Sequence, residues 1–524
     1  MFRTLLAALL LTSALGAEPV RKLDILFVGA HPDDDSTCTA SLARYAAQGK
    51  KIGVVTVTRG EQGGNLSGPE QGAALGLLRE GEERAALQFL GIPTVHYLER
   101  TDSGFTTSLK VSERNWNRLE TLKRLLLLVR FYRPEVLITM SPAPRGHGDH
   151  QLVSQLTTEA FFDSARGGEE GLAAWAPRKL YYTLEYGAEG LEPDLYIPSG
   201  EYGEPERQAL SFYRSQWPVE FLKVSPGEAF VLAASRVPGR GLLEGLDQPL
   251  RPPAPPRRSP ALELQRTPAL ARFLQWSRGL GLNLEVLAPA TRVCRPGQRV
   301  TWPLLPKGQA VVSAPQRPGS YPVTVRGLPG RLQVVPDLHL GRGWSAWQNV
   351  SGVWEGENHS PSDASARFRL RLSPTDLGLE VEVEDDQLLA SLPASQNRAH
   401  WRTDSVEITV DPSGRSQDTT TTFKLGVIIQ NLEGRPMAAR DADARPGPWG
   451  GPLEVQARPG GYRLKLEIPR RQLPAPLAQE FGFNLLVYDH DSGQAPSRLA
   501  WSAWETVQGW PELWGRVLTG TGEK

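Results

Sequence analysis

The stretch LDILFVGAHPDDD, residues 23–35, decides the fold of the first half of the chain. Residues 23–29 are mostly apolar, as expected for a strand that is buried on both faces. A helix is expected at residues 36–48, with Gly49 as its stop. One histidine and three aspartates lie between the strand and the helix. In a doubly wound sheet ligands bind at the carboxyl ends of the strands, so this loop is the first candidate site.

The alternation of strand and helix continues to about residue 236. Further strands are expected at residues 52–58 and 136–140, and further helices at residues 75–90, 119–129 and 152–160. Short links between alternating elements predict an α/β fold, with a Rossmann-like, mainly parallel sheet covered by helices on both faces. We expect this domain to span residues 22–236.

The rest of the chain predicts β structure. A Pro-rich linker and a short helix are expected at residues 237–280, and a small β domain at residues 281–336. From residue 340 apolar and charged residues alternate strictly, as in YRLKLEI at 462–468, and nine of the 14 tryptophans lie here. A period of two with one charged face predicts antiparallel strands, and several such strands predict a β-sandwich over residues 340–524.

Composition excludes several classes of protein. The 58 basic and 58 acidic residues give a net charge of zero, which argues against a nucleic-acid binder. Two cysteines exclude a disulfide framework and a four-cysteine zinc module. Cys38 and Cys294 fall in different expected domains, and whether they pair is open.

The first 17 residues predict export. Arg3 precedes an apolar run that ends in small residues before Glu18, which is the pattern of a secretory signal peptide. The run stops near 12 residues, whereas a membrane-spanning helix needs about 20. We therefore expect a secreted or extracytoplasmic protein, in the periplasm or at the cell surface, without a transmembrane anchor.

A second polar cluster, RGHGDH at residues 145–150, follows the strand expected at 136–140. It is expected at the same edge of the sheet as residues 30–35. An aspartate-rich helix start would explain Asp35 but not His31. Two histidines and a carboxylate with an open fourth position are typical of a catalytic zinc site.

Together, AHPDD at residues 30–34 and HGDH at 147–150 resemble the PIG-L/LmbE-like zinc-dependent de-N-acetylases over residues 22–236. The resemblance implies hydrolysis of the N-acetyl group of N-acetylglucosamine conjugates or related amides. It also implies site roles: zinc or another divalent metal on His31, Asp34 and His150, Asp33 as general base, His147 at the oxyanion or as general acid, and Asp149 orienting a ligand imidazole. Asp35 stands where the family often has Glu, and Tyr213 where some members have His, which puts a substrate contact there in doubt.

The last domain resembles the family 9 carbohydrate-binding modules over residues 340–520. VEVEDD at 381–386, WRTDSVEITVD at 401–411 and YRLKLEIPRRQL at 462–473 carry the resemblance. It implies tryptophans that stack on sugar rings and, often, bound calcium. The candidate calcium ligands are Asp385, Asp386, Asp404 and Asp489. Ordinary turn carboxylates and core tryptophans are the alternative interpretation, and sugar binding is open.

The leading hypothesis is an exported zinc amidohydrolase that deacetylates an amino-sugar glycan or glycoconjugate. A non-catalytic glycan-binding protein and a zinc hydrolase of a non-sugar amide are the alternatives. Four residues flank the expected site and are either sugar contacts or solvated surface: Arg59, Glu61, Arg79 and Asn65. The glycine-rich loop at residues 60–76 is a candidate lid.

Overall fold

The computed structural model describes residues 22–520 except 66, 69, 71, 144–145, 168–170, 185–192, 217–224, 254–274, 277–278, 281–289, 304–308, 326–327, 357, 359, 417, 492–495 and 505–506. The expected signal peptide and most of the expected linker and short helix lie outside the described residues. The chain divides into two compact units. One contains the seven-stranded sheet, and the other contains the β structure from Ala290 onward.

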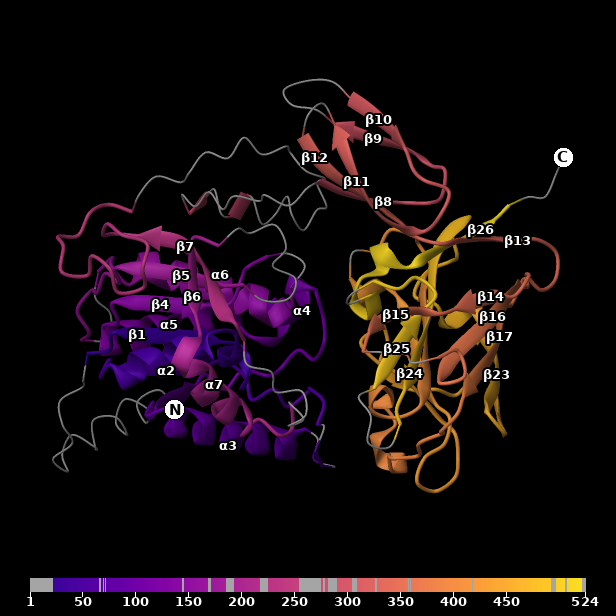
Figure 1. Ribbon diagram of the computed structural model, residues 1–524, viewed down its shortest axis with the longest axis horizontal. Coiled ribbons are helices and arrows are strands. Elements are labelled where there is room, and N and C mark those ends of the chain that lie inside the picture. The colour runs from indigo at the N-terminus through magenta and orange to yellow at the C-terminus, as the bar shows by residue number, and fades with distance from the viewer. Residues whose placement is uncertain are drawn as a thin grey trace. The chain divides into compact units, whose positions relative to one another are not determined.

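The first unit has a seven-stranded sheet of order β3-β2-β1-β4-β5-β7-β6, and Figure 1 shows β7, β5, β4 and β1 side by side. The five strands from β3 to β5 pair in parallel, whereas β7 pairs antiparallel with both β5 and β6. The strands are β1 (Ile25–Gly29), β2 (Ile52–Thr56), β3 (Thr94–Tyr97), β4 (Val136–Thr139), β5 (Lys179–Thr183), β6 (Leu195–Pro198) and β7 (Gly227–Ser235). This confirms the predicted mainly parallel sheet.

The strand order places the topological switch point of the sheet between β1 and β4. The chain moves from β1 outward to β3, then returns to β4 and continues to β5. Because parallel crossovers are right-handed, the helices of the two branches lie on opposite faces of the sheet. The helical elements are η1 (Asp34–Thr37), α2 (Thr39–Ala47), α3 (Ala73–Phe89), α4 (Leu109–Asn115), α5 (Arg118–Tyr132), α6 (Gly148–Asp163), η2 (Gly200–Tyr202) and α7 (Gly203–Leu210). The loops after β1 and β4 carry the two polar motifs, so both motifs meet at the position where such sheets bind ligands.

Two details differ from the sequence prediction. The helix expected at residues 36–48 begins with the 3-10 turn η1 and becomes α-helical only at Thr39. Strand β3 is not predicted from the sequence, because its four residues, TVHY, are too few to show a period.

Among the described residues, no helix is both long and apolar enough to cross a membrane. Cys38 and Cys294 are both free and buried.

The second unit is built from β-strands. A first group comprises β8 (Ala290–Cys294), β9 (Arg299–Pro303), β10 (Gln309–Ser313), β11 (Gly319–Val325) and β12 (Leu328–Val334). It forms a hairpin and a three-stranded sheet. Trp302 and Leu332 are among the buried residues of its own small core.

Two further sheets follow, and their strand pairs are antiparallel except for β13 with β26. The larger contains β13 (Asp337–Leu340), β15 (Gly352–Glu355), β18 (Ser405–Asp411), β19 (Phe423–Ile428), β20 (Met437–Arg440), β21 (Gly447–Pro448), β24 (Glu480–Asp489), β25 (Ser497–Ala500) and β26 (Gly515–Thr519). The smaller contains β14 (Gln348–Val350), β16 (Ala364–Leu372), β17 (Asp376–Asp385), β22 (Leu453–Arg458) and β23 (Gly461–Pro469). One shared core buries apolar residues of both sheets, such as Phe368 and Ile408, which confirms the predicted antiparallel sandwich.

Candidate active site

Three side chains from two loops converge beyond the ends of β1 and β4. His31 follows β1, Asp34 begins η1, and His150 lies in the first turn of α6. His31 Nδ1 lies 3.1 Å from His150 Nε2, His150 Nε2 lies 3.2 Å from Asp34 Oδ1, and His31 Nδ1 lies 3.6 Å from Asp34 Oδ1. Tetrahedral zinc with bonds of 2.0–2.1 Å separates its ligand atoms by about 3.3 Å. The three atoms therefore fit one divalent metal ion.

The backbone holds Asp34 in this orientation. Its Oδ2 accepts hydrogen bonds from the N–H groups of Ala30, at 2.6 Å, and His31, at 3.0 Å. The other carboxylate oxygen, Oδ1, therefore faces the two histidines. Gly29 makes the close approach possible, because a Cβ there would lie 2.9 Å from the Cβ of Asp34. Burial opposes ionisation of Asp34, but the neighbouring His150 and His31 hold its pKa well below the usual range.

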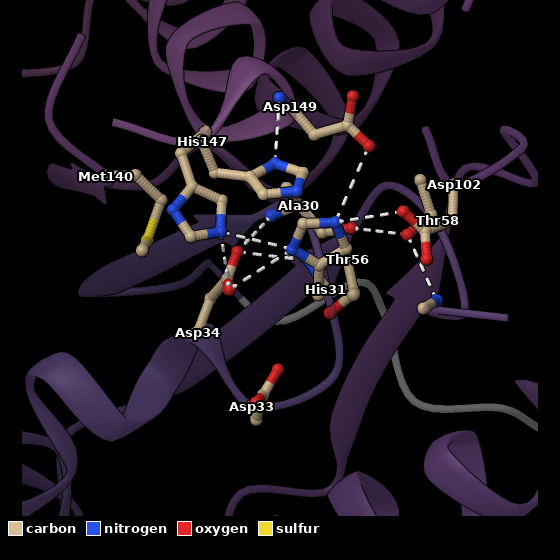
Figure 2. Close-up of polar contacts among 12 residues, drawn as sticks. Ala30, His31, Asp33, Asp34, Thr56, Thr58, Asp102, Met140, His147 and Asp149 are labelled. Carbon is tan, nitrogen blue, oxygen red and sulfur yellow. Dashed lines mark hydrogen bonds and ion pairs between the residues drawn. The ribbon is translucent and has the colours of Figure 1, made fainter. Parts of the chain in front are cut away.

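The other ring nitrogen of His31 faces two carboxylates. Its Nε2 lies 3.4 Å from Asp102 Oδ1 and 3.5 Å from Asp149 Oδ2, and Figure 2 shows both on the side of the ring opposite Asp34. Burial lowers the pKa of His31, and Asp102, Asp149 and Asp34 together raise it well above its ordinary value. Metal-binding histidines commonly donate their second N–H to a carboxylate, which fixes the tautomer. Asp149 thus lies where a residue that orients a ligand imidazole would be.

Asp102 is a further residue of the site that the sequence motifs do not include. It lies in the loop after β3, at the same edge of the sheet as the two motifs. The available signal was a carboxylate after an unrecognised strand, so it could not be placed at this edge.

His147 is the N-cap of α6. Its Nδ1 accepts a hydrogen bond from the Asp149 N–H at 3.1 Å, so in the neutral ring the proton is on Nε2. Its ring packs edge-on against His31, with centroids 4.9 Å apart. Burial and the two neighbouring imidazoles lower the pKa of His147 to about 4. The structure therefore brings His147 next to the predicted ligands, while Arg145 of the same motif lies outside the described residues.

Asp33 is the accessible carboxylate of the first motif. Its side chain is 20% exposed, against 5% for Asp34. Asp33 Oδ1 accepts a hydrogen bond from Arg79 Nη2 at 2.7 Å. In Figure 2 Asp33 stands apart from the contacts that join the histidines. The loop thus separates one exposed carboxylate from the buried ones.

The other flanking residues form contacts within the protein. Arg59 pairs with Glu80 and Glu99, and Asn65 Oδ1 accepts N–H groups of its own loop. Glu61 Oε1 accepts a hydrogen bond from the Asp102 N–H at 3.0 Å.

Tyr213 is fully buried, and its hydroxyl donates a hydrogen bond to Asp35 Oδ1 at 2.7 Å. Tyr213 is therefore not on an open surface. Burial raises the pKa of Asp35 to about 7.

A second cluster of carboxylates lies in the sandwich. Asp385, Asp404 and Asp489 are buried, and each offers an oxygen within 4.8 Å of the others. Asp489 Oδ1 is buried and has no hydrogen-bond partner. Burial, with neighbouring carboxylates contributing, raises the pKa of Asp385 to about 6, of Asp404 to about 9 and of Asp489 to about 7. Three further aspartates extend the cluster: Asp363, Asp386 and Asp491. Four of these six are the predicted calcium ligands, and the sequence pattern did not indicate Asp363 and Asp491.

The tryptophans of the sandwich are all at least partly buried. Trp344 and Trp347 are flanked by guanidinium groups, with Arg369 about equally close to both rings at 5.1 and 4.8 Å. Trp510 and Trp514 belong to a core beside the larger sheet, and Trp354, Trp401 and Trp504 are half-buried against that core. A sugar platform among these rings stays a prediction.

Comparison with known proteins identifies two matched regions. Residues 26–161 match the family model described as GlcNAc-PI de-N-acetylase, PIG-L, and residues 341–520 match the carbohydrate family 9 binding domain-like model. Together they include the two His/Asp motifs and the aspartate cluster.

Curated relatives and a solved structure resemble the first region. A 1D-myo-inositol 2-acetamido-2-deoxy-alpha-D-glucopyranoside deacetylase of Kineococcus radiotolerans is 29% identical over 44% of this chain and 75% of its own length. The enzyme of the same name from Mycobacterium bovis is 33% identical over 36% of this chain and 69% of its own length. Others of that name are matched over only 58–62% of their length. N,N'-diacetylchitobiose deacetylase from Pyrococcus horikoshii is 21% identical over 43% of this chain and 90% of its own, with a TM-score of 0.33.

Proposed function

The chain belongs to the GlcNAc-PI de-N-acetylase (PIG-L) family, and we propose that it is a zinc-dependent amidohydrolase that removes the N-acetyl group from an N-acetylglucosamine-type sugar or glycoconjugate. The observation that carries the proposal is the convergence of His31 Nδ1, Asp34 Oδ1 and His150 Nε2 within 3.1–3.6 Å of one another. Three nitrogen and oxygen ligands with an open fourth position are the donor set of catalytic zinc.

The remaining residues supply what amide hydrolysis requires. A zinc ion held by His31, Asp34 and His150 would lower the pKa of a bound water to about 7 and polarise the carbonyl oxygen of the amide. Asp33, the exposed carboxylate of the loop, accepts the proton of the water that attacks the carbonyl carbon. The same carboxyl group then gives this proton to the amine nitrogen as the C–N bond breaks and acetate is released. The Nε2–H of His147 donates a hydrogen bond to the carbonyl oxygen as negative charge develops on it. The hydrogen bond from the Asp149 N–H to His147 Nδ1 supports this role, because it keeps the proton of the neutral imidazole on Nε2.

The acetamido-sugar substrate is supported by the relatives. The curated enzymes that the chain resembles are deacetylases of a 2-acetamido-2-deoxy-glucopyranoside joined to inositol. The group that such an enzyme hydrolyses is the acetamido group on the glucose ring, so we propose an N-acetylglucosamine-type compound without specifying its aglycone.

The test is acetate release by zinc-loaded protein from a panel of N-acetylglucosamine conjugates. We expect release by the wild type and a fall of about 10²–10⁴-fold in kcat for Asp33→Asn, the loss typical of a missing general base. Zinc stoichiometry should be unchanged in that variant, since Asp33 is not a proposed ligand. Zinc binding with no acetate release, but with hydrolysis of non-sugar amides, would favour the non-sugar alternative. Absence of both zinc binding and hydrolysis, with retained glycan binding, would favour the non-catalytic alternative.

For the sandwich we propose glycan binding and a calcium ion. The match to the family 9 binding model over residues 341–520 supports the first, and the buried Asp385, Asp404 and Asp489 support the second. All-oxygen carboxylate sites suit calcium. Polysaccharide pull-down of the full chain, with and without calcium, tests both, and Asp489→Ala should remove the calcium dependence.

We also propose export, which rests on the pattern of residues 1–17. Mass spectrometry of the protein recovered outside the cytoplasm should find cleavage after Ala17. An uncleaved N-terminus in a cytoplasmic protein would contradict it.

A further inference from the structure

The aspartate cluster of the sandwich lies next to a turn that carries a tryptophan. Asp404 directly precedes β18, and Asp489 is the last residue of β24, the antiparallel neighbour of β18. Trp401 belongs to the 3-10 turn η5 (His400–Arg402), which leads into β18. Residues 400–404, here called the strap, therefore connect Trp401 to the cluster.

His490 joins the strap to the cluster from the neighbouring strand. It directly follows Asp489, and its backbone N–H donates a hydrogen bond to Asp404 Oδ1 at 2.8 Å. Its ring Nε2 lies 2.9 Å from the carbonyl oxygen of Trp401. Because a carbonyl oxygen only accepts, Nε2 carries the proton of this hydrogen bond. One residue thus binds the strap twice, through its backbone at Asp404 and through its side chain at Trp401.

Further contacts hold the two ends of the strap. Asp404 Oδ2 accepts a hydrogen bond from the Leu389 N–H. At the other end, Nε2 of the buried His400 lies 2.9 Å from Oε2 of the buried Glu407. The ring of His400 packs edge-on against that of Trp401, with centroids 5.5 Å apart. Contiguous hydrogen bonds and packed side chains of this kind carry energetic coupling between two sites.

Trp401 is placed where a ligand can reach it. It is half-buried against a small core on the outer face of the larger sheet, to which Leu486 of β24 belongs. Trp344 and Trp347 are less suited to stacking on a sugar, because two guanidinium groups lie over each of their rings. The tryptophan that His490 holds is therefore a better candidate for a sugar contact than either of these two.

We propose that His490 couples the aspartate cluster to Trp401, so that calcium bound by the aspartates strengthens the binding of a sugar ring on Trp401. The proposal rests on the proposed function, in which the sandwich binds calcium and a glycan. Neighbouring carboxylates disfavour one another's charge, and a cation that gathers their oxygens fixes Asp404 and Asp489 in place. His490 passes this constraint to the Trp401 carbonyl. It is a positioning residue, because it acts through Trp401.

The coupling should be reciprocal between the two ligands. Calcium should strengthen glycan binding by about 5–150-fold, and saturating glycan should strengthen calcium binding by the same factor. His490→Ala keeps the backbone N–H to Asp404 and removes only the ring contact. In this variant the coupling factor should fall to about 1, while the calcium affinity measured without glycan changes by less than about threefold.

Two further variants separate this role from a general effect on folding. His490→Gln places an amide N–H near the Trp401 carbonyl and should recover part of the coupling. His339→Ala is the matched control, because His339 lies on β13 of the same sheet with its side chain 71% exposed. The control should couple the two ligands as the wild type does.

The experiment is calorimetric titration of each full-length variant with calcium chloride and with chitohexaose or cellohexaose, each with and without the other ligand. The expected result is coupling in the wild type and His339→Ala, partial coupling in His490→Gln and none in His490→Ala. Equal coupling in the wild type and His490→Ala, or no coupling in a wild type that binds both ligands, overturns the proposal. A wild type that binds no calcium contradicts the proposed calcium site and the coupling with it.

A wild type that binds calcium but neither oligosaccharide would contradict the proposed glycan binding alone. The role of His490 is then measured by fluorine NMR of protein labelled with fluorotryptophan, in which residue 401 gives the resonance that is absent from Trp401→Phe. Calcium should shift this resonance in the wild type and leave it unchanged in His490→Ala. A shift of equal size in both proteins overturns the proposal.

Discussion

Burial raises the pKa of the carboxylates in both clusters of this protein, but the neighbouring side chains shift it in opposite directions. In the first unit the imidazoles of His150 and His31 hold the pKa of Asp34 well below its usual range. In the sandwich burial and neighbouring carboxylates raise the pKa of Asp404 to about 9. The histidines can carry positive charge in the first cluster, whereas the second is built from aspartates alone. The donor sets differ accordingly: nitrogen with oxygen suits zinc, and oxygen alone suits calcium.

Removing a histidine should have the largest effect and should affect one cluster only. For His150→Ala we expect zinc affinity to fall by more than the roughly 100-fold that outer-sphere changes cost, since a ligand itself is lost. Acetate release should become undetectable, while calcium-dependent stability persists. Metal analysis after dialysis against zinc measures the first effect. Zinc retained at one per chain would remove His150 from the ligand set.

Calcium should stabilise the second unit and leave the first unit unaffected. A ligand at 100 times its Kd that binds only the folded state adds about 2.7 kcal/mol to the free energy of unfolding. Calorimetry with calcium against a calcium chelator measures this gain, and Asp489→Ala should abolish it. The variant should keep its zinc and its acetate release. An equal gain in wild type and variant would place calcium elsewhere.

The dependence of stability on pH should separate the clusters further. In the calcium-free sandwich the pKa values of Asp385, Asp489 and Asp404 are raised to about 6, 7 and 9. In the unfolded chain these groups lose their protons near pH 4. The folded state then binds more protons, so the free energy of unfolding falls as pH rises from about 4 to 9. Bound calcium favours the ionised form and should flatten this slope.

Urea unfolding of chelator-treated protein at pH 5 and pH 8, repeated with calcium, measures the slope. Asp404→Asn should flatten it without calcium, because the group with the highest pKa no longer ionises. A slope that is the same with calcium, without it and in Asp404→Asn would show that this cluster does not control the pH dependence.

An ion pair outside both clusters should have the smallest effect. Glu382 lies on the exposed face of the smaller sheet and pairs with Arg367 and Arg463. Exposed pairs contribute about 0.2–1 kcal/mol and are screened by salt. We expect Glu382→Gln to lower the free energy of unfolding by no more than this, less at high salt, with both metals still bound. Loss of either metal would mean that the sheet face is coupled to a cluster.

The sequence was most informative where one motif contained both a strand and the polar residues that follow it. The run through residues 23–35 predicted β1, the sheet edge and three polar side chains, because strand burial and loop position follow from local pattern. Period-two alternation predicted β16 and β23 for the same reason.

The contacts that sequence could not predict join segments far apart in the chain. Arg79 reaches Asp33 across 46 residues, and Asp102 approaches His31 only because the four-residue strand β3 brings its loop to the same edge. Asp363 and Asp491 join the second cluster from separate loops. In each case the partner depends on loop path and side-chain rotamer, which local pattern does not encode.

Anomalous diffraction from crystals grown with zinc and calcium tests the central claim most directly. Data collected above and below the zinc absorption edge distinguish the two ions at atomic positions. We expect a peak among His31, Asp34 and His150 that disappears below the edge, and a weaker calcium peak among Asp385, Asp404 and Asp489. A zinc peak elsewhere, or none in zinc-saturated crystals, would contradict the assignment of the active site.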